Sequence, residues 1–174
     1  PDVELRVVDD AGEACGAGEV GELWIRSPAA MDGYLRAEPE THAVMRDGWF
    51  RTGDLARISP AGFVTIVGRK KDLILRGGYS VVPGEVEATL LAHRAVAEAA
   101  VVGIPDAALG EEVAAFVTLR PGAQVDGDEL VAFCRGQLAA FKYPRRVSIV
   151  EALPKSATGK VLKWQLTSRE GAGL

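Results

Sequence analysis

The sequence predicts an α+β protein in which a β-rich first part is followed by a small α/β part. Apolar and polar residues alternate at period two through much of residues 3–67, as they do in half-buried strands. After Gly68, strand-like and helix-like segments alternate instead, and the charged run 69–72 separates the two patterns. The 174 residues are 48% hydrophobic, enough to bury the core of one domain or of two small ones. We therefore expect domains at 1–68 and 69–174.

In the first part, turn residues set off the expected elements. A Gly-rich stretch at 12–18 separates two alternating segments, which predicts a hairpin or meander. Asp47-Gly48 ends a short helical segment of about two turns, and Ser59-Pro60-Ala61-Gly62 is typical of a turn between two strands. The expected strands are 3–8, 20–26, 55–58 and 63–67, and the expected helix is 38–45.

In the second part, two helices are expected among three strands. Pro83 suits the first turn of a helix whose apolar positions are Val86, Leu90 and Leu91. Asp126 or Asp128 can cap a second helix. Its apolar face is expected to comprise Leu130, Phe133, Cys134 and Leu138, the strands are 100–104, 113–119 and 146–150, and the tail 171–174 is expected to fray.

Charge and residue usage narrow the classes of partner. Lys and Arg number 20 against 24 Asp and Glu, so the net charge of −4 provides no overall positive field for nucleic acid or an anionic membrane. Any bound anion must be met locally. Cys15 and Cys134 have no Cys or His neighbour at metal spacing, so neither a metal site nor a disulfide is expected. No apolar run approaches the length of about 20 residues that spans a bilayer, and we expect a cytoplasmic protein.

Two segments could carry chemistry on their residues alone. Residues 154–160 combine small hydroxylated residues, a Gly and Lys160, which predicts a mobile loop able to deliver an ammonium group to an anion; an exposed turn with a solvated Lys is the alternative. The sequence is not a Walker phosphate loop, because Pro154 and Val161 stand where that pattern needs Gly and Ser or Thr. Asp54 follows Gly53 at the expected mouth of a strand, where it could accept hydrogen bonds from two vicinal hydroxyls or simply form a turn.

Two further segments leave the same choice open. The cations at 69–71 could meet a nucleotide or could keep a linker solvated. In Arg76-Gly77-Gly78-Tyr79, the glycines allow the backbone to approach another group closely, and a plain β-turn explains them equally well.

Six motifs occur along the chain in an order that resembles the superfamily of acyl-CoA synthetases, peptide-synthetase adenylation domains and beetle luciferases. They are GELWIR (21–26), GY (33–34), RTGD (51–54), GRKKD (68–72), PGEVE (83–87) and PKSATGK (154–160). The resemblance implies that 1–68 is the β-rich end of a large N-terminal AMP-binding domain and that 69–174 is the small mobile C-terminal domain. It also implies that the nucleotide loop and the acyl pocket belong to a missing N-terminal region.

The resemblance implies roles in a two-step reaction that joins a carboxylic acid to ATP as acyl-AMP and then passes the acyl group to a thiol. Lys160 matches the catalytic Lys that bridges the carboxylate and the nucleotide oxygens. Asp54 matches the carboxylate that holds the ribose hydroxyls, and Arg69 matches a cation near the ribose and phosphate. Lys71 matches the hinge about which the C-terminal domain rotates between the steps.

The resemblance also assigns residues to contact with coenzyme A. Gly78 matches a glycine that lines the pantetheine tunnel, and Arg135 matches a cation that meets the CoA nucleotide in some relatives. A second basic cluster comprises Lys142, Tyr143, Arg145 and Arg146. Ser80 departs from the larger polar residue found there in many relatives, which leaves its role open.

The resemblance therefore predicts an AMP-forming acid-thiol ligase that activates a carboxylic acid, of the fatty type, and transfers it to coenzyme A. Its implied cofactors are ATP, coenzyme A and a Mg²⁺ ion bound with ATP, and no metal ligand is expected in this segment. The segment alone is expected to be inactive. Two alternatives remain, an adenylation domain that loads a carrier protein and a stand-alone noncatalytic module. The acid itself cannot be named, because the residues that shape its pocket lie elsewhere.

Overall fold

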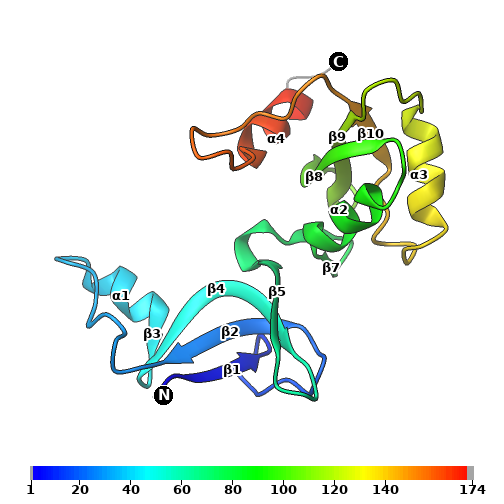
Figure 1. Cartoon of the computed structure of the whole chain (residues 1–174). Helices are drawn as coiled ribbons and strands as arrows, with labels where there is room; N and C mark the ends of the chain where they lie inside the picture. The colour runs from blue at the N-terminus through cyan, green and yellow to red at the C-terminus, as the bar shows by residue number, and fades with distance from the viewer. Residues whose placement is uncertain (1, 172–174) are drawn as a thin grey trace. The chain divides into compact units, whose positions relative to one another are not determined.

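The computed structural model describes residues 2–171, and side chains are described for residues 2–167. The chain divides between Lys71 and Asp72 into two compact units. Unit 1 is built on a five-stranded sheet, sheet A, and unit 2 on a second five-stranded sheet, sheet B (Figure 1). Few helices accompany these strands, so the predicted α+β class is confirmed.

Sheet A consists of antiparallel strands in the order β1-β2-β4-β3, with β5 also paired to β4. One face is apolar and packs around Val7, Leu23 and Ala56. On the other face the guanidinium of Arg6 lies 4.7 Å from the ring centre of Trp24 and 4.2 Å from that of Trp49, so cation–π contacts cover this side. The elements of unit 1 are β1 (Glu4–Val8), β2 (Gly21–Arg26), α1 (Glu38–Val44), β3 (Met45–Arg46), β4 (Trp49–Ile58) and β5 (Val64–Arg69).

A bulge interrupts strand β4 at the RTGD motif. Its partner β2 advances two residues, from Glu22 to Trp24, while β4 advances four, from Leu55 back to Arg51. Gly53 lies in the bulge with a φ of +70°, which a side-chain-bearing residue rarely adopts. The prediction that Asp54 stands at the mouth of a strand is therefore wrong, because β4 begins at Trp49 and Asp54 lies in its middle.

Unit 2 has three layers, because both faces of sheet B are apolar and each is covered. Helices α2 and α3 cover one face, which we call the α2/α3 face, and α4 covers the other, the α4 face (Figure 1). The long antiparallel pair β8 and β9 lies at the centre, and β10 pairs with β9 in parallel. The elements are the short 3-10 turn η1 (Lys70–Asp72) at the junction, then β6 (Ile74–Arg76), β7 (Tyr79–Val81), α2 (Pro83–Leu91), β8 (Val96–Asp106), β9 (Gly110–Leu119), α3 (Gly127–Arg135), β10 (Arg146–Ile149) and α4 (Lys163–Gly171).

Strand alternation explains how the central pair serves two cores. Val101 pairs with Ala115 in the ladder, and both face the core beneath α2 and α3. The next pair, Val102 and Ala114, faces the core beneath α4, which also contains Leu166. Since neighbouring residues point to opposite faces, the whole run 113–118 of β9 is buried, and its sequence lacks the polar alternation of a half-exposed strand.

Helix α3 follows the prediction at its start and departs from it at its end. Asp126 is the N-cap, and its carboxylate accepts a hydrogen bond of 2.8 Å from the Glu129 amide. The helix ends at Arg135 with Gly136 as its C-cap, so Leu138 packs against the core from the following loop and not from the helix. In α2, Leu90 is buried as expected, but Leu91 is 44% exposed.

The sequence did not predict β3, η1, β6, β7 or α4. Strand β3 and the hairpin β6–β7 are too short for a periodic pattern, and β4 extends six residues further toward the N-terminus than the predicted strand at 55–58. Helix α4 has few apolar residues, and its burial depends chiefly on Leu166. It includes Gly171, the first residue of the tail expected to fray, whereas 172–174 lie outside the described residues.

The two glycines that flank α3 should respond differently to replacement by alanine. At Gly127 an added Cβ would lie 2.3 Å from the Val147 carbonyl oxygen, so Gly127→Ala should lower the free energy of unfolding by about 1–3 kcal/mol. At Gly136 the φ is −73° and the nearest atom would lie 3.5 Å away, so Gly136→Ala should be neutral or stabilise by up to about 1 kcal/mol. Denaturant unfolding followed by circular dichroism measures both, and equal effects would contradict the packing argument.

Candidate functional site

The two residues predicted to bind nucleotide are in contact. Asp54 on β4 is the ladder partner of Arg69 on β5, and the Arg69 Nε lies 2.7 Å from Asp54 Oδ1. Two hydrogen bonds hold the backbone that carries this carboxylate. The Asp54 amide donates to Thr52 Oγ1, and the Thr52 hydroxyl donates to the Leu23 carbonyl. Asp54 is partly exposed, and its carboxylate retains lone pairs beyond the one that faces Arg69, so it can still accept a hydrogen bond from a hydroxyl group.

Lys71, the predicted hinge, is the last residue of unit 1. It lies in η1, its side chain is exposed, and it makes no ion pair with any described residue. Its neighbour Lys70 differs, because Lys70 Nζ lies 2.8 Å from Asp10 Oδ1 and 3.3 Å from Glu22 Oε2. The end of unit 1 is thus held by Lys70, and Lys71 is free of such contacts with the described part of the chain.

The predicted catalytic Lys160 lies in a turn with its own hydrogen bonds. The Ser156 amide donates to the Lys160 carbonyl, and the Lys160 amide donates to Ser156 Oγ. Gly159, with a φ of +81°, closes the turn. The Lys160 side chain is exposed and has no partner among the described residues, so its ammonium group is available to an anion.

Two ion pairs attach the segment around Lys160 to the rest of unit 2. Lys155 pairs with Glu98 on β8. The Lys163 Nζ lies 2.7 Å from Glu87 Oε1 on α2. The same oxygen accepts a hydrogen bond from the Val101 amide. The segment is therefore anchored at both ends by ion pairs. The sequence analysis had expected a turn here but not these ion pairs.

On the other side of unit 2, an aromatic stack joins two segments that are predicted to contact coenzyme A. Gly78 occupies the tip of the β6–β7 hairpin at a φ of +83°. The next residue, Tyr79, stacks on Phe141 with ring centres 4.5 Å apart. Phe141 directly precedes Lys142, whose Nζ lies 2.8 Å from the Glu85 carboxylate of α2. Gly78 and Lys142 are thus brought to one region by contacts that the sequence analysis missed.

Two guanidinium groups, those of Arg76 and Arg135, lie near enough to Arg145 to repel it. Arg145 lies 3.7 Å from the ring centre of Tyr143 and donates to the Ala140 carbonyl. Partial desolvation and repulsion from Arg76 and Arg135 lower the pKa of Arg145, and Glu112 opposes this change. The residue is nevertheless exposed at the surface, so the desolvation is incomplete. Arg76 is paired with Glu112, whereas Arg135 has no partner among the described residues. This unneutralised charge suits an anion such as a phosphate.

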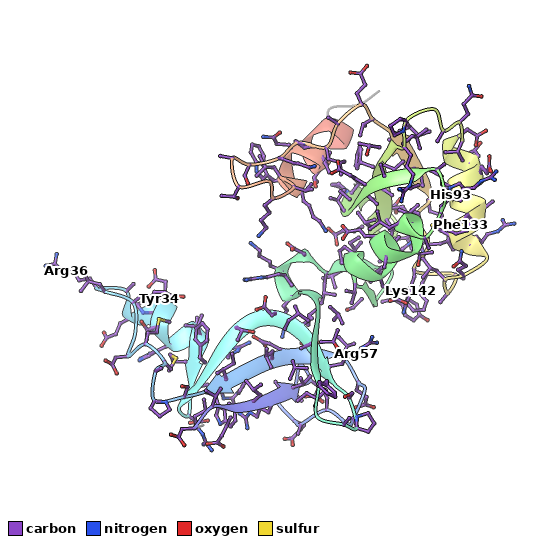
Figure 2. All side chains as sticks on the ribbon, in the orientation of Figure 1. Tyr34, Arg36, Arg57, His93, Phe133 and Lys142 are labelled. Carbon is purple, nitrogen blue, oxygen red and sulfur yellow. The ribbon has the colours of Figure 1, made fainter. Side chains whose placement is uncertain are left out.

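The predicted catalytic and CoA residues lie on opposite sides of sheet B. Phe141 and Tyr143 pack against the core of the α2/α3 face. Val161, which directly follows Lys160, packs against the core of the α4 face together with Leu153. Figure 2 shows Lys142 beside α2, away from α4. Unit 2 therefore presents two separate polar surfaces.

Several residues of these surfaces could not be identified from the sequence. Phe141 lies in a short loop without a pattern, and its role depends on the stack with Tyr79. Glu85 and Glu87 belong to the PGEVE motif, which contributed to the family resemblance but did not predict that these carboxylates bind lysines. Arg146, which was predicted to belong to the basic cluster, is the first residue of β10.

The described residues hold no group of three or more His, Cys, Asp or Glu side chains arranged to bind a metal ion. No helix among them is long and apolar enough to cross a bilayer.

Unit 2 has the fold of a known domain family. Residues 85–160 match the AMP-binding enzyme C-terminal domain. The chain is 44% identical over 162 residues to a long-chain-fatty-acid–CoA ligase of Bacillus subtilis (strain 168), covering 93% of the chain and 29% of that protein. It is 41% identical to a 4-coumarate–CoA ligase-like protein of Arabidopsis thaliana, covering 96% of the chain and 30% of the relative.

A solved structure covers both units. The crystal structure of ATP-bound MatB from Rhodopseudomonas palustris matches 97% of this chain and 34% of its own, with a TM-score of 0.91 and 39% identity. Unit 2 therefore carries the C-terminal domain of AMP-binding enzymes. The chain corresponds to the C-terminal part of acyl-CoA ligases and spans about 30% of the length of the curated relatives it matches.

The pair between Glu112 and Arg76 should make stability depend on pH. Burial raises the pKa of Glu112, but hydrogen bonds from Arg76 and the Val113 amide outweigh it and hold the pKa below 4.5. A depressed carboxyl pKa stabilises the folded state above pH 4.5, and this contribution is lost as the pH falls through the folded-state pKa. Glu112→Gln should therefore cost about 2 kcal/mol at pH 7 and progressively less in acid. Urea unfolding at several pH values measures this difference, and a constant difference would contradict it.

Proposed function

We propose that this chain is the C-terminal part of an acyl-CoA ligase that activates a carboxylic acid with ATP and transfers it to coenzyme A. The observation that carries the proposal is the placement of two cationic surfaces on opposite sides of sheet B. One exposes Lys160. The other carries Arg135 and Arg145, and on the same side Tyr79, the residue after Gly78, stacks on Phe141. A reaction in two steps can use the two surfaces in turn if unit 2 rotates about Lys71.

In the first step, Lys160 would stabilise the negative charge that gathers where the carboxylate meets the nucleotide phosphate. A fixed ammonium group acts most strongly there, because the transition state concentrates charge that the separate reactants do not. Asp54 and Arg69 would hold the ribose, since their contact leaves a carboxylate oxygen for a hydroxyl.

In the second step, the α2/α3 side would receive coenzyme A. Arg135 and Arg145 suit its phosphates, and Lys142 and Tyr143 would complete the surface. Gly78 has open space where a Cβ would stand, which leaves room for a narrow chain such as pantetheine.

Magnesium would arrive bound with ATP. As the resemblance implies, we expect its protein ligands to lie outside this segment.

The fatty nature of the acid and the identity of the acceptor are the finer parts of the proposal. The B. subtilis relative is named for long-chain fatty acids and the A. thaliana relative for 4-coumarate, so relatives of similar identity differ in acid. The cationic cluster favours coenzyme A over a carrier protein, because a carrier protein brings its own pantetheine arm and no free nucleotide. A cytoplasmic location, where ATP and coenzyme A are both available, completes the proposal.

Lys160→Ala should impair acyl-AMP formation in the full-length enzyme that contains this chain. We expect the rate to fall on the order of a hundredfold or more, as for one lost electrostatic contact in a transition state. ATP–pyrophosphate exchange measures this step, and thioester formation from supplied acyl-AMP should survive. Lys155→Ala, which removes a neighbouring ammonium already paired with Glu98, should cost much less. Loss of transfer from preformed acyl-AMP in Lys160→Ala would contradict the assigned role.

Gly78→Leu should leave acyl-AMP formation nearly intact and block thioester formation, because a branched side chain would stand where pantetheine must pass. The φ of +83° adds backbone strain to this change. Gly122→Leu is the matched control, since Gly122 has a φ of +77° and a Cβ added there would meet no atom within 4 Å. The control should lower stability by a similar amount without a selective loss of thioester formation. An unimpaired overall reaction in Gly78→Leu would refute the assignment.

A further inference from the structure

Glu22, in the GELWIR motif, is a buried carboxylate with no role in the proposed chemistry. It is 5% exposed, and no other charged side chain among residues 2–167 is buried. Burying a carboxylate is costly unless cations and hydrogen-bond donors compensate it. The partners of Glu22 therefore indicate what the residue holds in place.

Those partners come from the two motifs that flank the predicted nucleotide site. Glu22 Oε2 accepts hydrogen bonds from Arg51 Nη2 at 3.2 Å and from Lys70 Nζ at 3.3 Å. Arg51 lies on β4, three residues before Asp54. Lys70 directly follows Arg69, the partner of Asp54 in the β4–β5 ladder. One oxygen of Glu22 thus links β2 to Arg51 on the Asp54 strand and to Lys70 next to Arg69.

Lys70 is held a second time by Asp10, which lies between β1 and β2. The Lys70 Nζ is 2.8 Å from Asp10 Oδ1. The two carboxylates hold the Lys70 side chain against sheet A, although 35% of that side chain remains exposed. Lys71, the next residue, is exposed and makes no such contact with any described residue. The attachment of the chain to unit 1 therefore ends between these two lysines.

We propose that Glu22 is a positioning residue that sets the N-terminal limit of the hinge. It holds Lys70 to sheet A, so rotation of unit 2 starts at Lys71 and does not extend back into β5. Glu22 also holds Arg51, so β4, the strand that carries Asp54, keeps its position relative to Lys70. The catalytic meaning of this inference rests on the proposed function, whereas the mechanical part rests on unit 1 alone.

The competing explanation is that the network only stabilises unit 1. Lys70→Met separates the two explanations, because it removes the hinge contact and leaves the pair between Glu22 and Arg51 in place. Glu22→Gln removes the charge from both contacts with little change of shape. Lys70→Arg keeps the cation and should restore the contact. Arg57→Met is the matched control, since Arg57 is an exposed cation on β4 with no partner among the described residues (Figure 2).

The first experiment measures amide hydrogen exchange by mass spectrometry on the 174-residue chain. In Lys70→Met and Glu22→Gln, peptides that cover 69–72 should exchange about tenfold faster than in the unmodified chain, as expected when a charged hydrogen bond no longer opposes local opening. Arg57→Met and Lys70→Arg should exchange at the unmodified rate. Unchanged exchange at 69–72 in Lys70→Met would overturn the proposal.

The second experiment measures both half-reactions in the full-length enzyme. If the network only stabilises unit 1, a variant loses active enzyme, and the rates of acyl-AMP formation and of thioester formation fall by the same factor. If Lys70 limits the hinge, Lys70→Met changes the ratio of the two rates, and we expect a change of about threefold or more. Equal losses would overturn the proposal. An enzyme that performs neither half-reaction would refute the proposed function instead, and hydrogen exchange would still decide whether Glu22 limits the hinge.

Discussion

The antiparallel pairing of β8 with β9 is the constraint on which the rest of unit 2 depends. The ladder runs from Val96 opposite Leu119 to Asp106 opposite Gly110, and its alternating side chains fill two cores. With both faces apolar, each must be covered, by α2 and α3 on one side and by α4 on the other. A sheet covered on both sides also provides two surfaces that face away from each other. The separation of the Lys160 turn from the cationic cluster is thus a consequence of the central pair.

Carboxylates hold the cationic segments that surround the proposed sites. Glu87 holds Lys163 beside the Lys160 turn, and Glu85 holds Lys142 on the opposite side. Such pairs at the surface contribute little stability, about 0–1 kcal/mol each. Their effect is mainly geometric, because each pair fixes the position of a cationic segment relative to α2. Glu22 differs from these pairs in being buried, so its loss leaves the Arg51 Nη2 donor without its partner and leaves Lys70 held by Asp10 alone.

The predicted site residues show where sequence reasoning reached its limit. Asp54 and Arg69 were each singled out, but their ion pair depends on the register between β4 and β5. The position of Asp54 within a bulged strand was missed, because the extra residues of the bulge around Gly53 leave no periodic signal in the sequence. The stack of Tyr79 on Phe141 joins residues that are 62 positions apart, and no local pattern reports a contact of that kind.

The sequence by itself determined the α+β class, the strands with clear alternation, a helix cap at Asp126 or Asp128 and the family order of the motifs, because these depend on neighbouring residues. The structure selects Asp126 as the cap. Tertiary structure decided the short strands, helix α4 and the distribution of the predicted residues over two sides of sheet B. It also decided that Glu22 is buried against Arg51 and Lys70. These features depend on contacts between segments far apart in the chain, which form only when register and layer packing bring the segments together.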